Sequence, residues 1–235
     1  RKADGSEGTV IMVQVENEIG MLGDARDHSK LAQNAYNSPV PYDMMYMLTS
    51  GKANDHINDV WKTAGKATTG SWKDVFGSSL EADEIFMAYW YARYTERVAA
   101  AGKAEYDIPM FVNTALNSRG RKAGEYPSAG PLAHLMPIWE TVAPSIDLIC
   151  PDIYDKGVAS WISQYATADN QLFIPEVRQE PENDYPGPGY DATGKWYITD
   201  LEATLNGKSL SARSAEESVF EIHYVDGQTV WMFVN

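Results

Sequence analysis

The chain has little of three things: cysteine, positive charge and long apolar runs. Cys150 is the single cysteine among 235 residues, which excludes an internal disulfide and a multi-cysteine zinc site. Lys and Arg number 19 against 33 Asp and Glu, and the formal net charge of -14 argues against binding to a nucleic-acid backbone. No apolar run reaches about 18 residues, so we expect no membrane span.

The chain starts with neither a Met nor an apolar signal segment, so we expect any export signal to lie outside this sequence. A single cysteine fits a cytosolic or periplasmic protein and disfavours a small disulfide-stapled secreted domain. Together with the acidic composition it is compatible with the location we expect, which is periplasmic or secreted. Hydrophobic residues make up 44% of the chain, enough for a sizeable core. The oligomeric state is left open by these features.

Residues 10 to 177 alternate between strand-like and helix-like segments. Nearly continuous apolar runs predict strands over Val10–Glu16, Ile108–Ala115, Ile146–Pro151 and Leu172–Val177. Between them, apolar residues at helical spacing predict helices over Ser29–Tyr36, Tyr42–Thr49, Leu80–Ala101, Leu132–Val142 and Gly157–Ala166. Gly102 is the expected end of the longest helix, and residues 65–77 read as a loop with a short turn. Apolar strands separated by helices predict a parallel sheet covered on both faces, an α/β fold with a (β/α)8 barrel favoured.

The pattern changes after residue 177. Residues 180–191 contain several Pro and Gly residues and exclude a regular helix. From Trp196 onward short alternating runs flank Asn206-Gly207 and Asp226-Gly227, two dipeptides typical of hairpin turns. We therefore expect a β-rich C-terminal domain over residues 191–235, after a barrel portion over residues 1–180.

Each predicted strand carries polar residues at its C-terminal end, the position where barrels and open α/β sheets bind ligands. These residues are Glu16, Asn17, Glu18, Asn113, Asp152, Tyr154 and Glu176. Two carboxylates facing each other across a pocket suit glycosidic bond cleavage, in which one protonates the leaving oxygen and the other attacks the anomeric carbon or activates water. The alternative is that Glu16 and Glu18 simply bind Arg side chains or backbone amides.

The stretch "VQVENEIG" closely resembles the acid/base motif of family 35 glycoside hydrolases, the β-galactosidase family, which usually has Tyr at the position of Ile19. The resemblance implies a retaining (β/α)8 enzyme without metal or organic cofactor, acting on an oligosaccharide or other glycoside. In it Glu18 is the acid/base, Asn17 contacts the sugar 2-hydroxyl and Glu16 lines or supports the pocket. "LFIPEV" is similar to strand seven of that barrel, which makes Glu176 the nucleophile, with Asn113 and Tyr154 as substrate or nucleophile contacts.

Counted by this resemblance, the four predicted strands are numbers four to seven of the barrel. The expected strands one to three do not precede Val10, so we expect the sequence to be part of a longer chain. Two further features stay open. Trp72 and Trp161 are the better candidates for sugar-stacking platforms, although core packing is the commoner use of Trp. A non-catalytic carbohydrate-binding protein on the same fold is the alternative to the enzyme.

Overall fold

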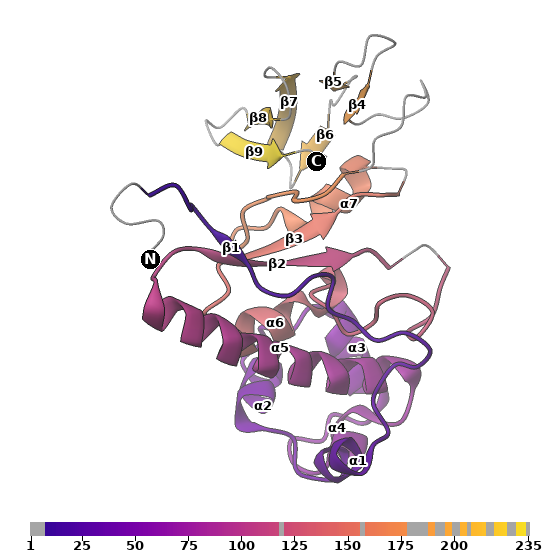
Figure 1. Cartoon of the computed structure of the whole chain (residues 1–235). Coiled ribbons are helices and arrows are strands. Elements are labelled where there is room, and N and C mark those ends of the chain that lie inside the picture. The colour runs from indigo at the N-terminus through magenta and orange to yellow at the C-terminus, as the bar shows by residue number, and fades with distance from the viewer. Residues whose placement is uncertain are drawn as a thin grey trace. The chain divides into compact units, whose positions relative to one another are not determined.

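The computed structural model describes residues 8–117, 120–155 and 158–177, and beyond them the strand segments within residues 188–233. Contacts divide the chain into two compact units, residues 1–147 and residues 148–235. Each unit is described by itself, and Figure 1 labels the elements of both. None of the described helices is both long and apolar enough to cross a membrane.

Three strands form the parallel sheet: β1 (Val13–Gln14), β2 (Met110–Ala115) and β3 (Leu148–Asp152), in the order β1-β2-β3. Val13 lies opposite Met110 and Gln14 opposite Phe111 in the parallel pair β1–β2. The prediction of a partial (β/α)8 barrel is therefore wrong for the part of the chain described here, which has three parallel strands in one sheet.

Two of the four predicted strands account for this correction. Leu172–Val177 forms no strand, although Val177 pairs in an isolated bridge with Ile153, just after β3. Pro175 within this segment has no N–H to donate to a strand ladder. The first run pairs over two residues instead of seven, and Ile11 is 60% exposed. An apolar run becomes a strand only where a neighbour pairs with it, and the run itself does not reveal the neighbour.

The helices of the first unit follow the predicted pattern closely. They are α1 (Lys30–Tyr36), α2 (Tyr42–Thr49), α3 (Asp55–Thr63), α4 (Trp72–Phe76), α5 (Leu80–Glu105), the 3-10 turn η1 (Ala133–Leu135) and α6 (Met136–Val142). α3 was not predicted, although Asn54 caps it by accepting the Ile57 N–H. α4 begins with a capping box between Ser71 and Asp74 within the stretch expected to be loop.

Helix α5 is the longest helix of the described part of the first unit, and α6 lies against it (Figure 1). Its predicted inner face is confirmed, since Ile85, Tyr89 and the alanines 88, 92 and 99 are buried. The helix does not end at Gly102, as expected, but continues to Glu105. A Cβ at position 102 would lie 2.6 Å from the Cε of Met110, so this glycine makes room for β2 to approach the helix.

The second unit contains β3, helix α7 (Val158–Tyr165) and six short strands between residues 188 and 233. The flanks of Asn206-Gly207 and of Asp226-Gly227 pair antiparallel, as β6 (Ala203–Leu205) with β7 (Lys208–Ser214) and β8 (Val219–Tyr224) with β9 (Thr229–Phe233). β4 (Pro188–Tyr190) and β5 (Trp196–Ile198) form a separate pair. The expected β-rich C-terminal domain is nevertheless wrong as a separate body, because these strands belong to one unit with β3 and α7.

Candidate functional site

The chain turns immediately after β1, and the turn carries the three polar residues of the motif. Glu16 and Glu18 have positive φ angles of 62° and 44°, in the left-handed region that costs a non-glycine residue about 1–3 kcal/mol. The Gln14 side-chain amide holds this turn by donating to the Glu16 carbonyl and to Asn17 Oδ1, both at 3.0 Å. The predicted strand through Glu16 thus ends at Gln14, and a turn held by hydrogen bonds follows it.

Asn113 fixes the same turn from the neighbouring strand. This residue of β2 is 1% exposed. Its Oδ1 accepts the Glu18 backbone N–H at 2.9 Å, and its Nδ2 donates to Asn17 Oδ1 at 3.1 Å. The structure therefore brings together Asn17, Glu18 and Asn113, three of the sequence-predicted site residues. Asn113 therefore orients both the Glu18 backbone and the Asn17 side chain.

Glu16 has a partner that the sequence does not reveal. The exposed carboxylate of Glu16 accepts a hydrogen bond from the Tyr94 hydroxyl of α5 at 2.7 Å. That hydrogen bond to an anion raises the pKa of the Tyr94 phenol above its ordinary value. One oxygen of the Glu16 carboxylate is thus held by helix α5. Within the described part of the first unit, the Glu18 carboxylate makes no hydrogen bond.

The chain after Glu18 packs directly against residues 126–130. Met21 and Ser128 exchange two backbone hydrogen bonds, each 2.9 Å long. A Cβ on Gly20 would lie 2.6 Å from the backbone of Pro127, and a Cβ on Gly130 would lie 2.3 Å from the Ile19 carbonyl oxygen. Glycine is required at both positions because the two backbones are in direct contact.

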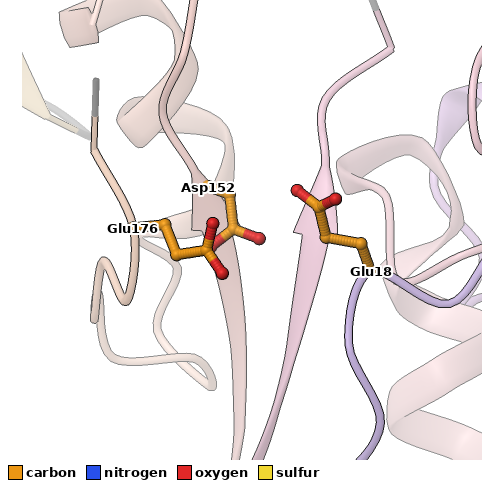
Figure 2. A group of neighbouring side chains, drawn as sticks. All are labelled: Glu18, Asp152 and Glu176. Atoms are coloured by element: carbon orange, nitrogen blue, oxygen red, sulfur yellow. The ribbon is translucent and has the colours of Figure 1, made fainter. Parts of the chain in front are cut away.

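The second unit carries the other predicted carboxylate. Glu176 accepts a 2.6 Å hydrogen bond from the Tyr154 hydroxyl at Oε2, and its backbone carbonyl accepts the Ile153 N–H at 2.8 Å. Asp152, at the end of β3, is 1% exposed, and a carboxylate oxygen of it lies within 4.8 Å of one of Glu176. Figure 2 shows Asp152 and Glu176 side by side; it also labels Glu18, which belongs to the first unit. The sequence placed Asp152 at a strand end without assigning it a role.

Chemically, the Asp152–Glu176 pair offers oxygen donors and a shared negative charge. Hard cations such as Ca²⁺ take oxygen ligands but need about six to eight of them, more than this pair supplies. The Tyr154 hydroxyl instead neutralises part of the charge on Glu176 and fixes the orientation of its carboxylate. An oriented, partly exposed carboxylate can act as a nucleophile or a base.

Trp72 and Trp161, the two candidates for sugar-stacking platforms, pack in the core instead. Trp72 is 1% exposed and stacks on Phe76 with ring centroids 5.7 Å apart, inside an aromatic cluster with Phe86 and Tyr89. Trp161 in α7 is 5% exposed. Both residues are core components, because their helices turn the indole rings inward. The tryptophan of α5, Trp90, is 40% exposed and lies edge-on to Tyr89.

No protein-family model matches the chain, and no curated protein matches it significantly.

Proposed function

We propose that this protein is a retaining glycoside hydrolase that cleaves terminal β-linked sugars, with β-galactosides as the leading substrate class. Glu18 is the acid/base and Glu176 the nucleophile. The observation that carries the proposal is the 2.6 Å hydrogen bond from Tyr154 to Glu176, which orients one carboxylate oxygen and leaves the other for attack. The resemblance of "VQVENEIG" to the family 35 motif supports the identity of Glu18.

The reaction proceeds in two displacements. In the first, a Glu176 oxygen forms a bond to the anomeric carbon while the bond to the leaving oxygen breaks, and Glu18 gives that oxygen its proton. In the second, Glu18 takes a proton from water, the water oxygen bonds to the anomeric carbon, and the Glu176–sugar bond breaks. Asn17, next to Glu18, hydrogen-bonds the sugar 2-hydroxyl.

The hydrogen-bonded turn after β1 supports this assignment. Asn113 binds the Glu18 backbone and the Asn17 side chain at once, so the acid and the amide are fixed relative to each other. Fixing reacting groups before the reaction is a large part of catalysis, since a displacement of about 1 Å costs about a hundredfold in rate. Glu16 is the less suitable acid because Tyr94 already binds its carboxylate.

The test is hydrolysis of an aryl β-galactoside by Glu18→Ala and Glu176→Ala, with azide as a second nucleophile. Each variant should lose at least about a thousandfold in turnover. Azide should then give the β-galactosyl azide with the Glu18 variant and the α-galactosyl azide with the Glu176 variant, because only the first still forms the covalent intermediate.

Glu16→Ala is the matched control, since it removes a carboxylate from the same turn, and its activity should fall by less than about tenfold. Native protein that binds galactosides without any turnover would contradict the enzyme and favour a carbohydrate-binding protein. Inverted product, read from the anomer first released, would contradict the nucleophile role of Glu176.

A further inference from the structure

A buried carboxylate of α5 binds the segment that backs the turn after Glu18. Glu84 is 1% exposed. Its Oε1 accepts the Ala129 N–H at 3.1 Å, and its Oε2 accepts the Tyr126 hydroxyl at 3.1 Å and lies 3.0 Å from His134 Nε2. A buried carboxylate is stable only where its oxygens are satisfied, so residues 126–134 are ordered around this one group.

Glu84 binds the backbone at a residue in a strained conformation. Ala129 has a φ of 65°, a left-handed conformation that an alanine rarely adopts. Its N–H is held by the Glu84 carboxylate, which compensates for the strain. On either side of Ala129, Ser128 pairs with Met21 and Gly130 accommodates the Ile19 carbonyl. The two residues that contact Ile19 and Met21 therefore flank the residue that Glu84 binds.

We infer that Glu84 is a positioning residue for Glu18. Glu84 holds Ala129; Ser128 and Gly130 then hold residues 19–21, and these fix the turn in which Glu18 stands. The role of Glu18 as an acid rests on the proposed function. The connection from Glu84 to the turn rests only on the contacts described above. Among the described residues, the Glu84 carboxylate forms no hydrogen bond with residues 16–18, so it acts through the backbone of residues 128–130.

The chain offers a matched control on the same helix. Glu96 of α5 also holds a loop with both carboxylate oxygens, accepting the Ser145 N–H at 2.8 Å and the Ser145 hydroxyl at 2.9 Å. Within the described residues, no hydrogen bond joins the loop around Ser145 to residues 16–21. Glu84→Gln and Glu96→Gln each keep the side chain's size and replace one acceptor oxygen by a donor, so a general loss of stability affects both.

The first measurement is hydrogen exchange of the Met21 and Ser128 amides in the full chain. In Glu84→Gln both amides should exchange at least about tenfold faster than in the native protein, and in Glu96→Gln less than about twofold faster. If Glu84→Gln does not fold, Tyr126→Phe removes one of the hydrogen bonds and should accelerate both amides about threefold. Equal exchange in the Glu84 or Tyr126 variant and in Glu96→Gln overturns the inference, whatever the activity.

The second measurement compares two leaving groups, because a displaced acid affects only substrates that need protonation. For Glu84→Gln, kcat/KM should fall by at least about tenfold for an aryl β-galactoside with a basic leaving group and by less than about twofold for a dinitrophenyl galactoside. An equal fall for both substrates overturns the positioning role. If the native protein hydrolyses no glycoside, the proposed function fails, and exchange alone decides whether Glu84 holds the turn.

Discussion

His56 is a half-buried imidazole whose protonation opposes folding. Its ring lies edge-on to that of His134, with ring centroids 4.8 Å apart. Burial is the main cause that lowers the pKa of His56 below its ordinary value, and the neighbouring His134 is the next cause. The charged groups around it are His134, Glu84, Glu81 and Asp59. Because the unfolded chain then binds the proton more tightly than the folded one, stability is full above the unfolded pKa of about 6.5 and is lost as the pH falls below it.

We therefore expect the free energy of unfolding, measured with urea, to decrease between pH 7.5 and pH 5.5, and His56→Gln to reduce that decrease. His28→Gln is the control, since His28 is half exposed beside Asp24, 3.1 Å away. A pH dependence that is unchanged in His56→Gln, or equally reduced in His28→Gln, would show that another group is responsible.

Some site residues are predictable from sequence one by one, and others are not. Asn17, Glu18 and Asn113 follow apolar runs, and parallel strands bring such ends to one edge of a sheet. Tyr94 and Glu84 lie within a long helix, and their partners Glu16 and Tyr126 are 78 and 42 residues away. A hydrogen bond over such a separation depends on packing, which residue type and spacing do not encode.

At the scale of elements, the contact between residues 19–21 and 127–130 leaves no room for a side chain. A Cβ at position 130 would lie 2.3 Å from the Ile19 carbonyl oxygen, an atom that cannot rotate away. We expect Gly130→Ala to lower the free energy of unfolding by about 1–3 kcal/mol, measured by urea denaturation, because the two backbones must separate.

Gly102→Ala is the comparison for this prediction. The added Cβ there would meet the Cε of Met110 at 2.6 Å, the mobile end of a flexible side chain, and alanine favours the helix. Its free energy of unfolding should change by less than about 1 kcal/mol. If Gly130→Ala is no more destabilising than Gly102→Ala, the tight contact is not a constraint on the fold.

Helices were easier to predict than strands for a physical reason. The buried face of α5 consists of residues that lie within a few helical turns of one another, so a short stretch of sequence reveals it. Capping is equally local, since Ser29 caps α1 by accepting the Ala32 N–H. A strand instead depends on a partner elsewhere in the chain. Residues 172–177 have the composition of a buried strand, and Leu172 and Ile174 are indeed buried. They pair through isolated bridges, however, and do not form a ladder. The barrel prediction was wrong because it counted apolar runs as paired strands.

At the scale of the whole molecule, the formal net charge of -14 governs how stability responds to salt. Like charges on a compact chain repel one another, and this repulsion is weaker in the expanded unfolded chain. Raising NaCl from 0.01 M to 0.1 M shortens the screening length from about 30 Å to about 10 Å. We expect the Tm at pH 7 to rise by about 2–4 °C, measured by differential scanning calorimetry.

The cause can be isolated by removing the charge instead of screening it. The sequence pI is about 4.6, so near that pH the net repulsion vanishes and the same addition of NaCl should leave the Tm nearly unchanged. Ion pairs such as Arg26–Asp83, 2.9 Å apart and shielded from solvent, are screened little and should respond weakly at either pH. A Tm that falls with NaCl at pH 7 would mean that favourable ion pairs outweigh the excess of acidic charge.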